Sequence, residues 1–81
     1  MKRKPSLVWD ESKAFGRGVK ATLDALDKSQ YWLEEQTGVG VSSLNKIIIG
    51  KSNPMLATAI KISQALKIDV HTLIRIGELP G

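Results

Sequence analysis

Apolar residues recur at three- and four-residue intervals along most of the chain, which is the spacing of one face of an α-helix. The first such stripe has spacings of four, four and three, and it consists of Phe15, Val19, Leu23 and Leu26. Asp10 or Ser12 is expected to cap this helix, and Gly16 and Gly18 are expected to weaken its opening turns. No segment alternates between apolar and polar residues for long enough to predict a strand, so the pattern predicts an all-α protein.

The next two predicted helices are short and follow each other closely. Ser29 is a good N-cap for the second, which carries Leu33 on its inner face, and Gly38 can end it because glycine tolerates positive φ. The turn Gly38-Val39-Gly40 leads directly into a third helix that begins at Val41. Two helices joined by a three-residue turn that contains glycine are typical of a helix-turn-helix motif.

Three consecutive isoleucines at the end of the third helix cannot all share one face. With Leu44 at the centre of the apolar side, Ile47 and Ile48 fall on that side by the three- and four-residue rule. Ile49 falls on the opposite, mostly polar side because successive positions are turned by about 100°. The polar residues of that side are Ser42, Asn45 and Lys46. Gly50 is expected to stop the helix.

Two more helices are predicted beyond the loop at Asn53-Pro54. The inward stripe of the fourth consists of Leu56, Ala59, Ile62, Ser63 and Leu66. Asp69 is expected to cap a fifth, which carries Leu73 and Ile74. A chain of 81 residues has room for one modest core, so we expect a single compact five-helix domain over residues 10–76, a basic and apolar arm over 1–9, and a tail over 77–81.

The charge pattern suits a polyanionic partner. Twelve Lys and Arg residues against eight Asp and Glu give a net charge of +4 and a pI near 9.6. Between Gln36 and Ile68 there is no acidic residue, whereas four lysines fall in that stretch. A lysine-rich face is also an ordinary solvated surface, so the charge alone leaves both interpretations open.

Several classes of function are not expected. The chain has no cysteine and one histidine, His71, so neither a metal site nor a cofactor is predicted. Gly50-Lys51-Ser52 copies the end of a phosphate-binding loop, but Asn45 stands where that loop needs its first glycine. No signal peptide is evident, and no segment approaches the roughly 20 apolar residues of a membrane span. We therefore expect a soluble cytoplasmic protein that is not an enzyme, with no small-molecule substrate and no membrane partner.

From about Phe15 to Ile76 the chain resembles the lambda-repressor-like (Xre-type) DNA-binding domains of phage repressors, Cro proteins and small bacterial regulators. The residues that match and keep the family's spacing are Ser29-Gln30, Leu33, Gln36-Thr37-Gly38-Val39, Leu44, Ile47, Gly50-Lys51, Asn53-Pro54, Ile62, Ala65-Leu66 and Leu73. The resemblance implies a lambda-repressor-like fold and a sequence-specific transcriptional regulator, such as a phage-type repressor, that binds double-stranded DNA.

Two residues depart from the family pattern. Glu34 stands where such domains normally carry alanine at a close helix crossing, so its side chain is expected to bend outward, with the carboxylate in solvent or near a lysine. Ile48 stands where glutamate is frequent, which removes one negative charge from the neighbourhood of the phosphates.

The third helix is the predicted recognition helix. Such a helix touches base edges with its N-terminal residues and its outward face, and here those residues are Val41, Ser42, Asn45 and Lys46. Phosphate contacts are expected from groups that flank the helix, namely Gln30, Ser43, Lys51 and Met55. Lys2, Arg3 and Lys4 are either an arm that reaches DNA or an ordinary basic terminus.

A homodimer is expected, because one such module buries only about 600 to 1,000 Å² on DNA. The apolar residues left for a dimer contact are Ile49, Ile74, Ile76 and Leu79. Ile49 is a dimer contact, a DNA-backbone contact or simply an exposed side chain. Trp32 rather than Tyr31 is expected to pack against the domain. The alternative from another class is a protein-interaction module, such as an antitoxin or phage antagonist with the same fold, although the acid-free recognition face favours DNA.

Overall fold

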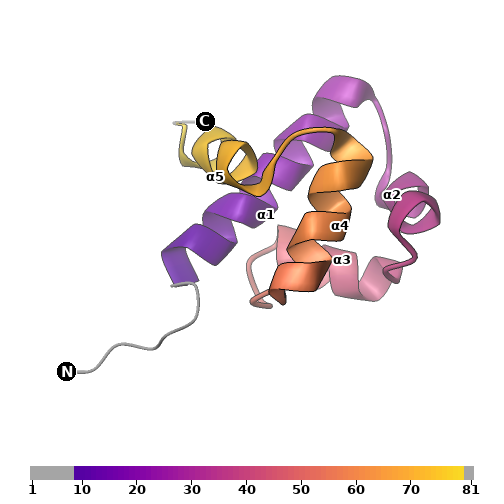
Figure 1. Cartoon of the computed structure of the whole chain (residues 1–81), viewed down its shortest axis with the longest axis horizontal. Helices are drawn as coiled ribbons and strands as arrows, with labels where there is room; N and C mark the ends of the chain where they lie inside the picture. Colours follow the sequence, from indigo (N-terminus) through magenta and orange to yellow (C-terminus); the bar gives the residue numbers. More distant parts are fainter. Residues whose placement is uncertain (1–8, 80–81) are drawn as a thin grey trace.

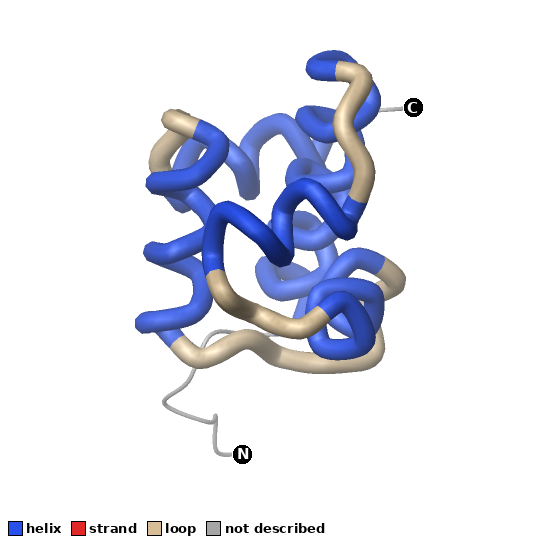
Figure 2. Tube along the Cα trace, turned by 90° about the vertical axis from the view of Figure 1, so that its right-hand side faces the viewer, coloured by secondary structure: helices blue, strands red, loops and turns tan. Residues whose placement is uncertain are grey.

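The structure, a computed structural model, describes residues 9–79, and over that range it contains five α-helices and no strand (Figure 1; Figure 2). The helices are α1 (Trp9–Leu26), α2 (Gln30–Thr37), α3 (Val41–Ile48), α4 (Leu56–Leu66) and α5 (Val70–Glu78). The predicted all-α, five-helix class is therefore confirmed. Lys2, Arg3 and Lys4 lie outside the described residues.

The 18-residue helix α1 packs extensively against two of the other helices. It packs along α5 and also against α3, while α4 contacts both α2 and α5. In Figure 1, α5 lies on one side of the molecule and the α2–α3 pair on the other, with α4 between them. The pair predicted to bind DNA is thus held by contacts to both α1 and α4.

One core joins all five helices. Its members are Phe15, Val19, Leu23, Leu33, Leu44, Ile47, Ile48, Ala59, Ile62, Leu66 and Leu73. Trp32 packs against this cluster, as predicted, whereas its neighbour Tyr31 remains 69% exposed. Most members of the three- and four-residue stripes read from the sequence therefore converge on a single interior. Leu26, predicted for the inner stripe of the first helix, does not, because it is the last residue of α1 and is 47% exposed.

The capped helix starts confirm two predictions. The Oγ of Ser29 accepts a hydrogen bond from the N–H of Trp32 (3.1 Å), at the start of α2. An oxygen of the Asp69 carboxylate accepts one from the N–H of Thr72 (2.8 Å), at the start of α5. Each bond satisfies a backbone donor that has no partner within its helix.

The start of α1 corrects the predicted cap. The helix begins at Trp9, so Asp10 and Ser12 lie inside its first turns rather than at its N-cap. Ser12 falls on the buried face of α1, where its hydroxyl donates a hydrogen bond to the side-chain oxygen of Asn53. Capping chemistry alone could not reveal that tertiary partner. At the other end, α5 continues to Glu78, beyond the predicted domain boundary at residue 76.

Glycines in α1 and α5 permit close helix crossings. A Cβ on Gly18 would lie 1.9 Å from the carbonyl oxygen of Leu73, and one on Gly16 would lie 2.1 Å from that of Ile47. Gly77 approaches the backbone of α1 in the same way from the side of α5. The two glycines expected to weaken α1 therefore lie in a continuous helix, at the places where α3 and α5 approach its backbone.

Leu56 contradicts the predicted inward stripe of α4. The other four members of that stripe are buried, but Leu56 is 71% exposed. It is the first residue of α4, where the helix starts outside the packed interior. Its side chain lines an apolar groove on the surface instead.

Candidate nucleic-acid interface

Hydrogen bonds of a local side chain, that of Thr37, fix the connection between α2 and α3. The Thr37 hydroxyl donates to the carbonyl of Leu33 (2.8 Å) and accepts from the N–H of Val39 (3.1 Å). Gly38 adopts φ +78°, which glycine reaches without strain, and thereby ends α2 as predicted. Val39 packs against the core, so the turn fixes α3 at a defined orientation to α2.

The rotation of α3 about its axis separates apolar from polar side chains. Leu44, Ile47 and Ile48 are buried. Ser42, Ser43, Asn45 and Lys46 are exposed, and Ile49 is 54% exposed just beyond the helix. Val41 at the first position is half-buried. The expected division of the three isoleucines, two inward and one outward, is confirmed.

The end of α3 is closed by Gly50 with φ +82°. The N–H of Lys51 donates to the carbonyl of Lys46 (2.8 Å), and the N–H of Gly50 donates to that of Ile47 (3.2 Å). This pair of bonds is the Schellman arrangement, which satisfies carbonyls left over at a helix end. It places the exposed Lys51 immediately after α3.

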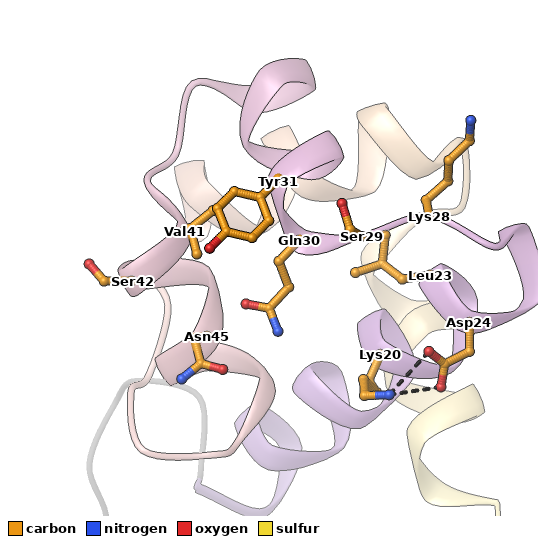
Figure 3. A pocket seen from close by; sticks show the side chains of 10 residues that line it. All are labelled: Lys20, Leu23, Asp24, Lys28, Ser29, Gln30, Tyr31, Val41, Ser42 and Asn45. Carbon is orange, nitrogen blue, oxygen red and sulfur yellow. Dashed lines mark hydrogen bonds and ion pairs between the residues drawn. The ribbon is translucent and has the colours of Figure 1, made fainter.

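A hollow of about 590 Å³ lies on one side of α3, between α1 and the start of α2 (Figure 3). It brings together four of the predicted contact residues, namely Gln30, Val41, Ser42 and Asn45. Figure 3 shows the amides of Gln30 and Asn45 on neighbouring helices of this hollow. A predicted phosphate contact and three predicted base contacts therefore border the same space.

A second hollow, of about 320 Å³, lies on the other side of α3. Lys46, Ser43 and Met55 line it, together with residues of the loop before α4. Met55 is the N-cap residue of α4 and is 74% exposed. Lys51 lines neither hollow, although it is exposed. The outer face of α3 therefore lies between two depressions that are both bordered by predicted contacts.

The first hollow also contains residues that sequence reasoning missed: Lys20, Asp24, Lys28 and Tyr31. Lys20 and Asp24 form an exposed ion pair on α1, with 2.9 Å between Nζ and Oδ2 (Figure 3). Their four-residue spacing is visible in the sequence, but it does not show which helix lies beside that face. An exposed pair of this kind contributes at most about 1 kcal/mol to stability.

The charge around α3 is mostly positive. The residues that line the two hollows include Lys20, Lys28 and Lys46, and Asp24, already paired with Lys20, is the one acid among them. Glu34 is half-buried, and within residues 9–79 no buried side-chain nitrogen or oxygen lacks a hydrogen-bond partner. The unusual glutamate at this crossing is therefore accommodated without an unpaired buried charge. Ile48 joins the core instead of presenting an acid at the surface.

The residues predicted for a dimer contact line neither of the two hollows beside α3. Ile49 lies beside Lys13 and Arg17 of α1. Ile74 packs partly against the core, Ile76 is half-buried, and Leu79 is 67% exposed.

Residues 9–79 contain no cluster of three His, Asp or Glu side chains able to hold a metal ion. None of the helices in that range is long and apolar enough to cross a membrane. His71 is exposed on α5.

The comparisons with known proteins agree with this geometry. A family model described as helix-turn-helix matches residues 19–73, which include all of α2, the turn and α3. The match also covers the second half of α1, all of α4 and the start of α5. The comparison with curated proteins found no match.

Proposed function

The chain belongs to the lambda-repressor-like (Xre-type) helix-turn-helix family of DNA-binding regulators, and on this premise we propose that it binds one specific sequence of double-stranded DNA with α3 in the major groove. In this proposal α3 is the recognition helix, and the turn after α2 sets its angle to the duplex.

The observation that carries the proposal is the exposed polar face of α3. Ser42, Asn45 and Lys46 point away from the core that Leu44 and Ile47 enter. A polar helix face could equally be a solvated surface. Here, however, it follows a fixed helix-turn-helix connection and lies between two hollows with a mostly positive border.

The exposed side chains match the hydrogen-bonding groups of base edges. The amide of Asn45 can pair with adenine, the ammonium group of Lys46 can donate to guanine, and the hydroxyl of Ser42 can serve several bases. Val41 is half-buried, and its exposed part offers an apolar surface to a thymine methyl group.

Phosphate contacts on both sides of α3 would fix its register in the groove. Gln30 borders the first hollow, while Ser43 and the start of α4 at Met55 border the second. Lys51 follows the end of α3 and adds a cation. Such contacts orient a protein on DNA without reading its sequence.

We further propose that the protein acts as a homodimer and as a phage-type repressor or small bacterial regulator. One module of this size covers a single half-site, and two half-sites about 34 Å apart would double the contact. The exposed apolar residues Ile49 and Leu79 support a contact between copies.

Selection of bound sequences from random duplex DNA tests binding, symmetry and spacing at once. We expect enrichment of a near-palindromic site with half-sites about one helical turn apart. Enrichment of a lone half-site would contradict the dimer. If no sequence is enriched, base reading is excluded and the protein-interaction alternative is favoured.

A matched pair of lysine variants tests the role of α3. Lys46→Ala should weaken binding to the selected site by about 1 to 3 kcal/mol and binding to random DNA by much less. Lys61→Ala removes the same charge from an exposed position on α4 that lines neither hollow, so it should bind almost as the wild type does. Equal losses from the two variants would reject base reading by Lys46.

A further inference from the structure

An apolar groove of about 450 Å³ lies between the first turns of α1, the start of α4 and α5. Phe15, Ala59 and Ile74 contribute to its walls, and Met55 and Leu56 border it with 74% and 71% of their surface exposed. Adjacent large apolar side chains with such exposure are typical of a surface that another apolar group covers.

The chemistry of the groove indicates an apolar occupant. Its polar members Ser12 and Asn53 hydrogen-bond to each other, so that pair does not call for a polar ligand. The side chains of Leu56 and Ile74 cannot donate hydrogen bonds to phosphates or to base edges. Met55 also borders the second hollow beside α3, but DNA binding by α3 does not account for Leu56 and Ile74.

The buried stripe of α1 leads from the groove toward the start of the chain. Ser12 and Phe15 line the groove and are buried together with Val19, at spacings of three and four. The position four residues before Ser12 is Val8, and its neighbour is Leu7. The residues before them are Met1, the basic run Lys2-Arg3-Lys4, and then Pro5 and Ser6. The apolar part of the N-terminal segment is thus the part attached nearest to the groove.

We infer that Leu7 and Val8 of the same chain occupy this groove. Ser12 lies about 4.5 Å along the α1 axis from Trp9, because a helix rises about 1.5 Å per residue. Leu7 precedes Trp9 by two residues, which span up to about 7 Å. A chain that turns back along α1 at Trp9 therefore brings Leu7 and Val8 level with Ser12, at the near end of the groove. Their attachment gives an effective concentration on the order of millimolar, whereas a second copy or another protein must arrive from solution.

Cysteine pairs test this contact directly, because the natural chain contains no cysteine. In the full-length protein, Leu7→Cys combined with Leu56→Cys should form an intramolecular disulfide under mild oxidation at low protein concentration. Mass spectrometry and a non-reducing gel detect it. Leu56 is exposed, so its replacement should leave the fold intact.

The control pair is Leu7→Cys with Glu35→Cys, since Glu35 is exposed on α2 and α2 contributes no residue to the groove. We expect the first pair to close at least tenfold faster than the control. Equal rates would overturn the inference. A predominance of disulfide-linked dimers in the first pair would also overturn it and assign the groove to a second copy.

Methyl NMR spectra give a second measurement that needs no new disulfide. Replacing Leu7 and Val8 with serine should shift the resonances of Leu56 and Ile74, which line the groove, and leave those of Ile49 unchanged. Unchanged groove resonances, or equal shifts at Ile49, would contradict docking. Neither experiment contains DNA, so this inference stands or falls independently of the proposed regulator function.

Discussion

Tyr31 and Trp32 are neighbouring aromatic residues of α2 in different environments. Trp32 packs against the core, and the Nζ of Lys28 lies 5.5 Å from the centroid of its ring. Tyr31 is 69% exposed and lines the hollow that also contains Gln30 and Asn45 (Figure 3). A tyrosine in this position combines an apolar ring with a hydroxyl that can donate to a phosphate oxygen.

We therefore predict that Tyr31 contacts the same DNA strand as the proposed phosphate contact at Gln30. Tyr31→Phe should weaken binding by about 1.5 to 3 kcal/mol on the selected site and on random DNA alike, because it removes a hydrogen bond to a charged group. The thermal unfolding temperature should not change, since the hydroxyl is at the surface. Fluorescence anisotropy titrations on both duplexes measure the effect. A loss confined to the selected site would show base reading instead.

Helix crossings and helix ends determine how the elements of this domain fit together. α1 approaches the backbones of α3 and α5 at Gly16 and Gly18, and α5 contributes Gly77 to its own crossing with α1. In a helix interior alanine is normally more favourable than glycine by about 1 kcal/mol. At these crossings, however, the added methyl group would disturb the packing of the two helices, so the two effects on stability have opposite signs.

At Gly18 the loss of packing should exceed the gain in helix propensity. The added Cβ of Gly18→Ala would lie 1.9 Å from a backbone oxygen of α5, which can move only if the whole helix moves. We expect a net loss of about 2 kcal/mol or more in the free energy of unfolding. Gly40→Ala is the control, because nothing lies within 4 Å of its added Cβ and its φ is −61°. It should cost at most about 1 kcal/mol through the N-cap preference. Denaturant unfolding compares the two variants.

The cap of α5 makes stability depend on pH. Hydrogen bonds from the side chain of Thr72 and then from its backbone N–H lower the pKa of Asp69 below its ordinary value of 3.8. Because the pKa is lower in the folded state, the carboxylate contributes stability above the unfolded pKa, and this contribution is lost as the pH falls below about 4.

Asp69→Asn keeps an oxygen acceptor at the N-cap but removes the titration. Its unfolding temperature should therefore fall less steeply with acidification than that of the wild type, in scans from about pH 6 to pH 2. Parallel curves for the two proteins would show that Asp69 does not contribute to acid destabilisation.

The whole molecule carries a net charge of +4, and several of its cations surround α3. Lys20 and Lys28 border one hollow, Lys46 borders the other, and Lys51 follows the helix. The ionic strength at which binding is measured should therefore affect affinity strongly, because each neutralised phosphate releases counterions.

If Lys20, Lys28 and Lys51 contact phosphates, the logarithm of the binding constant should fall with the logarithm of salt concentration with a slope of about −2 to −3 per protomer. Lys51→Ala should reduce the magnitude of that slope by about 1, and Lys61→Ala should leave it unchanged. A slope near zero for the wild type would exclude phosphate binding by this surface.

Local patterns predicted much of the fold and part of the site. Three predictions are confirmed: the all-α fold class, the caps at Ser29 and Asp69, and the division of the isoleucines of α3. Each depends on residues within a few positions of one another. The cap of α1 was predicted wrongly because Ser12 lies inside the helix and bonds to the distant Asn53. The burial of Leu56 was predicted wrongly because α4 begins at that residue, which is 71% exposed. Contact between the predicted site residues and DNA remains a prediction.

The amino-acid sequence by itself determined where α2, the turn and α3 lie and which side of α3 is polar, since periodicity and turn chemistry act over short distances. Only the tertiary structure decided that Lys20, Asp24 and Tyr31 share a hollow with Gln30 and Asn45, and that an apolar groove lies beside the start of α1. Those arrangements depend on how closely the helices cross, and that depends on the packing of segments far apart in the chain.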